Sequence, residues 1–229
     1  MSDNTLPIYL TKFPGDLRDK YIKPITYTGL IIILDSLGMK KRSLENDPRV
    51  FEDWKMVIDD FRYDVEYKFR SFLFSFSDTI MIICHNSSMN INQFINKFAI
   101  DILIPNFIKF FVNGFPLRGS LSYGEYTVGQ NLVLGKAVNE ASVCYDKTEW
   151  IGITISPFRN YFSHVNYPFI YTQIPYKTGK LPGWALNWYP HITDEFVKIY
   201  KKFESGNKKT KSMVKYINTN NFLENLNKM

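Results

Sequence analysis

The sequence has only two cysteines in 229 residues, Cys84 and Cys144. Two cysteines are too few for a disulfide framework. Both lie among apolar or small residues, so we expect two buried, reduced side chains. Free thiols are typical of a reducing compartment, which predicts a cytoplasmic protein.

The sequence also lacks an apolar run near the ~20 residues that a membrane-spanning helix needs. The longest candidate, residues 94–115, is interrupted by two lysines, an aspartate and a proline. The first 19 residues lack the basic start and apolar core of a secretory signal. We therefore expect no membrane partner.

Several catalytic signatures are missing as well. The sequence has no Gly-x-Ser-x-Gly motif, no phosphate-binding P-loop and no paired cysteine motif. The three histidines, His85, His164 and His191, show no spacing typical of metal ligands. The sequence thus offers no signature of a serine hydrolase, a P-loop protein or a zinc site.

The net charge is +6, and lysines between residues 198 and 215 supply much of it. Such a tail can contact nucleic acid or phosphate. A lysine-rich run is more often a solvated helix face, and we favour that interpretation. Nucleic acid is therefore not an expected partner.

Apolar residues make up 45% of the chain, and their pattern predicts an α/β (α+β) fold. Short, mostly apolar runs predict strands at residues 28–34, 72–76, 79–84 and 150–155, and we expect a further strand at residues 117–123. Apolar residues at three- and four-residue steps predict a helix at residues 47–65. A second helical region, apolar on most of its surface, is expected at residues 90–111, and a short helix at residues 135–145. The first six elements follow the order strand, helix, strand, strand, helix, strand, which is a ferredoxin-like βαββαβ unit.

The composition changes after residue 156, where aromatic residues and prolines become frequent. We expect residues 1–156 to form the core domain and residues 157–229 an appended, helical C-terminal lobe of unknown role. Its helices are predicted at residues 194–203 and 211–226.

Two aspartates lie at the ends of strands that this topology makes neighbours. Asp35 ends the first strand, and Asp78 lies in the hairpin between the second and third strands. Each alone reads as an ordinary turn residue. Because the central strands of a ferredoxin-like sheet are neighbours, the two carboxylates are expected to converge. Such a pair can hold one or two Mg²⁺ or Mn²⁺ ions that bridge phosphate oxygens.

Four segments, in order, resemble class III adenylyl and guanylyl cyclases. Residues 35–39 (DSLGM) look like the Asp-x-x-Gly-Phe turn of that family. Residues 76–81 (FSDTIM) resemble its Gly-Asp hairpin, with Ser77 in place of the glycine. Residues 117–124 (LRGSLSYG) are similar to its Arg-x-Gly-x-His-x-Gly strand, and residues 135–142 (GKAVNEAS) to its Gly-x-x-Val-Asn-x-Ala-Ser helix.

The resemblance covers about residues 28–156 and implies a nucleotide cyclase catalytic domain with a palm-type core. It implies that Asp35 and Asp78 bind two Mg²⁺ or Mn²⁺ ions, with help from the Ser36 carbonyl. Asn139 would act from the partner subunit of a homodimer, because cyclase sites form at a head-to-tail interface. The ribose 3′ oxygen would attack the α-phosphate of a nucleoside triphosphate, giving a 3′,5′-cyclic nucleotide and pyrophosphate.

The resemblance also indicates where the nucleotide binds. Gly38, Lys40 and Lys41 are expected to contact the triphosphate. Ser75 replaces the lysine that reads adenine in the family, and Leu132 replaces the aspartate that does so. The residue pair that reads guanine is missing too. This favours UTP or CTP, and the compact architecture is similar to that of bacterial uridylate and cytidylate cyclases of anti-phage signalling.

The arginine that the family uses in the transition state, four residues after Asn139, is Val143 here. Arg118, Lys136 and Lys147 are the candidates to replace it. Its absence leaves open a second hypothesis, a catalytically inactive cyclase-like domain that binds nucleotide as a regulator. A third is a palm-type oligonucleotide synthase, against which Asn139 and the lack of a Gly-Gly-Asp-Asp hairpin argue.

Overall fold

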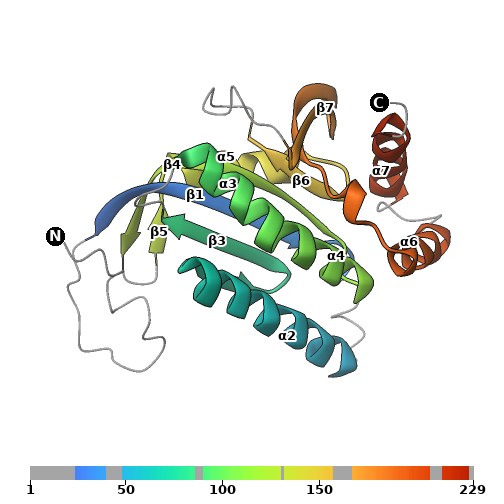
Figure 1. Ribbon diagram of the computed structural model, residues 1–229, viewed down its shortest axis with the longest axis horizontal. Coiled ribbons are helices and arrows are strands. Elements are labelled where there is room, and N and C mark those ends of the chain that lie inside the picture. Colours follow the sequence, from blue (N-terminus) through green and yellow to red (C-terminus); the bar gives the residue numbers. More distant parts are fainter. Residues whose placement is uncertain are drawn as a thin grey trace.

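The structure, a computed structural model, describes residues 24–39, 48–85, 90–129, 132–156, 167–206 and 213–226. In this part of the chain one sheet of eight strands is flanked by helices (Figure 1). The strand order is β2-β3-β1-β4-β6-β8-β7, and β5 pairs with β4 outside this path.

The strands are β1 (Ile25–Ser36), β2 (Phe72–Phe76), β3 (Thr79–His85), β4 (Leu117–Gly129), β5 (Leu132–Leu134), β6 (Gly152–Ile155), β7 (Phe169–Tyr176) and β8 (Gly179–Leu186). The α-helices are α2 (Pro48–Tyr63), α3 (Ile91–Phe98), α4 (Ile104–Val112), α5 (Lys136–Lys147), α6 (Asp194–Gly206) and α7 (Met213–Leu226). Two π-helical turns, Asp64–Lys68 and Ala99–Leu103, follow α2 and α3.

The predicted ferredoxin-like core is confirmed. β1 pairs antiparallel with both β3 and β4, and β2 and β3 form a hairpin. The order β2-β3-β1-β4 is that of a βαββαβ unit. β6 then joins β4 in parallel, after the crossover through α5.

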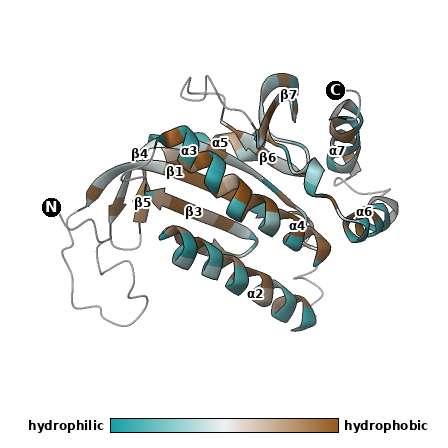
Figure 2. Ribbon diagram, viewed as in Figure 1, coloured by the Kyte–Doolittle hydropathy of each residue, from teal (hydrophilic) through white to brown (hydrophobic). Residues whose placement is uncertain are grey.

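A helical layer covers one face of the sheet. Leu30, Ile32 and Leu34 of β1 point into it and are completely buried with the apolar residues of α2, α3 and α4. The apolar sides of these helices turn toward the sheet, and their polar sides turn outward (Figure 2). The layer is rich in aromatic rings; Trp54 and Phe61 both meet Phe110 edge to face, with ring centroids 5.5 Å apart in each pair.

Local sequence signals mark the beginning and the end of the helices in this layer. The Asn90 side chain accepts a hydrogen bond from the Asn92 amide at 2.9 Å, which caps α3. A π-helical turn, Ala99–Leu103, lies between α3 and α4, and Pro105, which has no N–H to donate, follows it in the first turn of α4. Gly114 ends α4 with a φ of +88°, as a left-handed cap requires.

The opposite face of the sheet has a smaller apolar cluster. Ile31 and Ile33 of β1 point to this side and pack with Ala137 and Ala141 of α5. The continuous apolar run in β1 therefore reflects a strand that is covered on both faces.

The C-terminal part contains two helices near the predicted positions, α6 and α7, and a hairpin that the sequence analysis did not predict. The hairpin strands are β7 and β8, and β8 extends the sheet by pairing Ala185 with Thr154 of β6. α6 packs on α4, with the rings of Phe196 and Phe111 stacked 4.1 Å apart. The expected division of the chain at residue 156 stays a prediction, although the sheet and the core continue beyond it.

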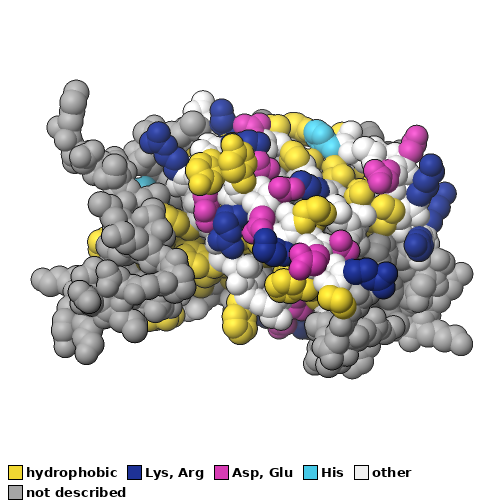
Figure 3. All heavy atoms as spheres, turned by 90° about the horizontal axis from the view of Figure 1, so that it is seen from below, with side chains coloured by type: hydrophobic (Ala, Val, Ile, Leu, Met, Phe, Trp, Pro, Cys, Tyr) yellow, Lys and Arg dark blue, Asp and Glu magenta, His cyan; other side chains and the backbone are white. Residues whose placement is uncertain are grey.

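On the face of the molecule seen in Figure 3, acidic and basic side chains are interspersed. On α2, Lys55 and Asp59 form an ion pair at 2.6 Å. No helix in the described ranges is long and apolar enough to span a membrane.

Candidate metal and nucleotide site

The two aspartates of interest are neighbours across the β1–β3 pair. Asp35 pairs with Thr79 in the strand register, so Asp78 lies directly beyond the end of this pairing. The Ser36 amide donates a hydrogen bond to the Asp78 carbonyl at 2.9 Å, which ties the two turns together. The topology thus places both residues at one end of the sheet; their role as metal ligands stays a prediction.

The turns at this end have unusual backbone geometry. Ser77, which replaces the glycine of the cyclase hairpin, has a φ of +56°, in the left-handed region that glycine adopts most easily. Gly38, in the turn after β1, has a φ of +87° and is exposed. Apart from its two chain neighbours, no residue in the described part of the chain has an atom within 4 Å of the position that a Cβ would take there, so these residues leave its backbone open to a ligand.

Arg118 is held firmly beside Asp35. Its Nε donates to Asp35 Oδ2 at 2.9 Å, and its Nη1 donates to the Thr148 carbonyl at 3.2 Å. Its guanidinium also lies over the ring of Tyr145, 5.6 Å from the ring centroid. The side chains of the ion pair are only 13% and 16% exposed, so water screens it less than a surface pair.

The glycine next to Arg118 makes this geometry possible. A Cβ on Gly119 would lie 2.5 Å from the Ile33 carbonyl oxygen and 2.4 Å from Leu34 Cδ2. Only glycine lets β4 lie this close to β1, which explains the Arg-Gly pair in physical terms.

The electrostatics at Asp35 favour a nearby cation. Burial raises the pKa of Asp35 above its ordinary value, and the Asp78 carboxylate acts in the same direction. Arg118 lowers this pKa through its hydrogen bond and charge, and Lys215 lowers it more weakly. A partly buried carboxylate next to a second carboxylate is stabilised in its charged form by added positive charge.

The donor atoms suit a hard divalent cation. Two carboxylates and a backbone carbonyl are oxygen ligands, which Mg²⁺ and Mn²⁺ prefer. The Ser36 hydroxyl is buried, and none of the described residues forms a hydrogen bond with it. No group of three or more Asp, Glu, His or Cys side chains gathers among the described residues.

The other predicted site residues are more scattered. Lys136 and Asn139 lie on an exposed side of α5 with Val143, and no hydrogen bond or ion pair within the described chain joins them to Asp35. Ser75 is exposed on β2, three residues before Asp78.

Two expected triphosphate contacts, Lys40 and Lys41, lie outside the described residues. Asp35, Ser36, Asp78 and Arg118 are therefore the predicted residues that the fold brings together, with Gly38 in the adjoining turn.

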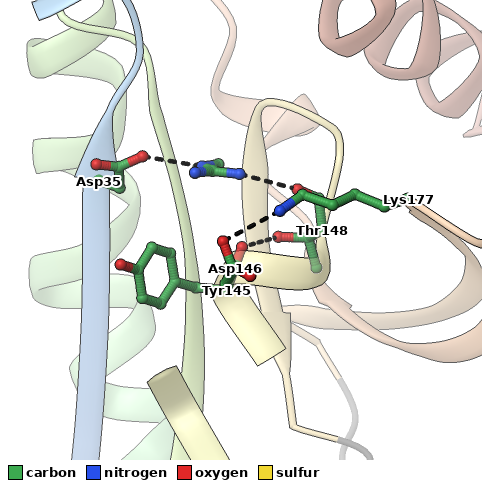
Figure 4. A network of polar contacts seen from close by, with 6 residues as sticks. Asp35, Tyr145, Asp146, Thr148 and Lys177 are labelled. Carbon is green, nitrogen blue, oxygen red and sulfur yellow. Dashed lines mark hydrogen bonds and ion pairs between the residues drawn. The ribbon is translucent and has the colours of Figure 1, made fainter. Parts of the chain in front are cut away.

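The sequence did not indicate the role of residues 147–151. This segment links the site to the C-terminal part of the chain (Figure 4). Thr148 in this segment accepts from Arg118, and its hydroxyl donates to the Tyr145 carbonyl at 2.9 Å. The Lys177 amide donates to the Lys147 carbonyl at 2.9 Å, and the Lys177 ammonium pairs with Asp146 at 3.1 Å. These contacts join residues far apart in sequence, so no local pattern indicates them.

Comparison with solved structures finds adenylyl and guanylyl cyclase domains that share this fold. The adenylyl cyclase CyaB from P. aeruginosa matches with a TM-score of 0.55 and 16% identity, over 72% of this chain and 96% of that one. The guanylyl cyclase Cya2 matches with a TM-score of 0.53 and 14% identity, over 72% and 93%.

A third match is the guanylyl cyclase domain of the RhoGC fusion protein from the fungus Blastocladiella emersonii, with a TM-score of 0.52 and 14% identity over 72% and 97%. At such identities the likeness establishes the fold alone. No protein-family model matches the chain, and no curated protein matches it.

Proposed function

We propose that the protein is a metal-dependent nucleotide cyclase. The observation that carries this proposal is the meeting of Asp35 and Asp78 at one end of a cyclase-type sheet, through the β1–β3 register. Asp35, Asp78 and the Ser36 carbonyl would hold Mg²⁺ or Mn²⁺. Such ions, when bound, neutralise charge on the phosphates and on the departing pyrophosphate.

The reaction would form one bond and break one bond at the α-phosphorus. The ribose 3′ oxygen bonds to the α-phosphorus and loses its proton to water, while the bond to the β-phosphate oxygen breaks and pyrophosphate leaves. The protein's share is positioning and charge stabilisation. Arg118 keeps the Asp35 carboxylate in place, and the exposed backbone at Gly38 can approach phosphate oxygens.

The exposed side of α5 fits a homodimeric arrangement. Lys136, Asn139 and Val143 follow one another at three- and four-residue steps, so they share one side of the helix. A second copy facing this side would receive Asn139 at its own carboxylate pair, as the sequence resemblance implies.

The substrate class that we propose is a pyrimidine nucleoside triphosphate. Ser75 and Leu132 are both exposed and carry no group that matches the adenine-reading lysine and aspartate. We include in this proposal a role in anti-phage signalling, because the sequence resembles uridylate and cytidylate cyclases of such systems.

The deciding experiment is incubation of the purified protein with ATP, GTP, CTP or UTP and Mn²⁺, followed by mass spectrometry of the products. A cyclic mononucleotide from UTP or CTP is the expected result. A product that joins two nucleotides through a phosphodiester would instead indicate an oligonucleotide synthase.

One observation favours a second candidate, an inactive cyclase-like domain that binds nucleotide. Val143 is 42% exposed on α5, so this helix presents a valine where the family presents a cation. If this second candidate is right, the protein should bind a nucleotide measurably but form no product from any of the four triphosphates.

A further inference from the structure

α7 is fixed next to the candidate site by specific contacts. Asn218 Nδ2 donates to the Glu149 carbonyl at 2.6 Å, and the Ile151 amide donates to Thr219 Oγ1 at 2.9 Å. The rings of Phe222 and Trp150 meet edge to face, 4.7 Å apart. These contacts bind α7 to the same segment, residues 147–151, that receives Arg118.

Lys215 lies one turn before Thr219, on the side of α7 that faces this segment. The Thr219 hydroxyl donates to the Lys215 carbonyl at 2.7 Å, which holds this turn of the helix. The Lys215 side chain is half-buried, and the charged groups that act on it are Arg118, Asp35, Glu149 and Lys177. The fold therefore brings an ammonium group from the C-terminal helix to the Asp35 end of the sheet.

The Lys215 ammonium differs from its basic neighbours in having no partner within the described chain. Arg118 is engaged by Asp35 and Thr148, and Lys177 is paired with Asp146. No hydrogen bond or ion pair joins the Lys215 ammonium to any described residue. Burial lowers the pKa of Lys215 to about 8, Arg118 acts in the same direction and Asp35 opposes it. A partly buried cation without a partner is stabilised when an anion binds to it.

We infer that Lys215 binds phosphate oxygens of the nucleoside triphosphate, and that α7 thereby supplies a cation that Val143 does not. This inference rests on the proposed function, because it places the triphosphate at the Asp35 and Asp78 carboxylates. With divalent ions on those carboxylates, the site would carry positive charge from the ions and from the Lys215 ammonium. A polyphosphate chain is the ligand class that this charge arrangement fits.

The test compares wild-type protein with Lys215→Gln, Lys215→Arg and the control Lys198→Gln. Lys198 is an exposed lysine of α6, so its replacement changes the net charge equally but away from the site. The readouts are binding of Mn²⁺–tripolyphosphate by calorimetry, and KM and kcat for the triphosphate that the wild type converts. Thermal unfolding confirms that each variant is folded.

We expect Lys215→Gln to weaken tripolyphosphate binding about tenfold or more, the loss typical of a charge-assisted hydrogen bond. Lys198→Gln should stay within twofold of wild type, and Lys215→Arg should recover most of the binding. Unchanged binding and unchanged kinetics in Lys215→Gln, with an active wild type, would overturn the inference and leave the cyclase proposal intact. A wild type that neither binds tripolyphosphate nor makes a cyclic nucleotide would overturn both.

Discussion

The two faces of the central sheet differ in what covers them. On one face α2, α3 and α4 form a continuous layer, and the side chains of Leu30, Ile32 and Leu34 are buried in it. On the other face α5 covers part of the sheet, and the apolar series Ile31, Ile33 ends at Asp35. The closed face supplies the apolar burial that stabilises the fold. The partly open face can hold charged groups that remain accessible to a ligand.

This difference arises within a single strand. Successive residues of β1 point to opposite faces, so Leu34 belongs to the core while Asp35, one residue later, pairs with Arg118. A one-residue shift in the β1–β3 register would exchange these positions. The comparison therefore predicts that substitutions on the helix-covered face reduce stability, whereas substitutions at the Asp35 end reduce activity.

The largest expected effect is on activity. Asp35→Asn and Asp78→Asn should each lower cyclase turnover at least about 10³-fold, because each removes a negative charge from the proposed metal site. Product formation by mass spectrometry measures this loss, and size-exclusion chromatography checks that the oligomeric state is unchanged. Asp59→Asn, on the exposed side of α2, is the matched control. Wild-type turnover in Asp78→Asn would falsify the metal-site assignment.

Thiol reactivity should show how well the helix-covered face excludes solvent. Cys84 is completely buried on β3, and burial raises its pKa to about 12. Because thiolate is the reactive form, its labelling at pH 8 should be roughly 10³-fold slower than that of a free cysteine, and should speed up as the pH rises. Reaction with a disulfide reagent in native and in denaturing buffer measures the ratio. Rapid labelling of native protein would contradict the closed-face description.

Substitution of two phenylalanines, one in the covered core and one on an exposed edge strand, compares how much each region contributes to stability. Phe107 of α4 is 1% exposed and packs against Trp188, whereas Phe76 of β2 is 86% exposed. Phe107→Ala should lower the free energy of unfolding by about 3–5 kcal/mol, because it leaves a cavity. Phe76→Ala should change it by less than about 0.5 kcal/mol. Chemical denaturation of both variants gives the two values, and equal losses would refute the contrast.

The smallest expected effect concerns the attachment of α7. Thr219→Val keeps the shape of the side chain but removes the acceptor for the Ile151 amide, which is then buried without a partner. The free energy of unfolding should fall by about 1–3 kcal/mol. Thr172→Val on β7 is the control, since its hydroxyl bonds to no described residue. If both variants unfold at the same denaturant concentration, α7 is not held by this hydrogen bond.

Much of the core was predictable from local patterns. The strands around Asp35 and Asp78, the helix after Pro48 and the helix near Asn139 all follow from apolar periodicity and turn residues. The approach of Asp35 to Asp78 was predictable because the ferredoxin-like order makes β1 and β3 neighbours. Each of these features depends on residues close together in sequence, or on a topology with few alternatives.

The C-terminal contribution was not predictable in the same way. β7 is interrupted by Pro175 and β8 by Pro182, so neither strand shows a clean apolar alternation. Lys215 belongs to a lysine-rich stretch whose default interpretation is a solvated helix face. Its position near Asp35 depends on Asn218 and Thr219 bonding to a segment some 70 residues earlier.

The sequence by itself therefore determined the βαββαβ core, the burial of its two cysteines and the place of the two aspartates at strand ends, because these depend on periodicity and local turn chemistry. The tertiary structure alone decided that Arg118 pairs with Asp35 and that β8 extends the sheet. It also decided that α7 brings Lys215 to the site. The physical reason is that long-range hydrogen bonds and ion pairs form between residues with no local sequence relationship, and they are fixed only when the whole core packs.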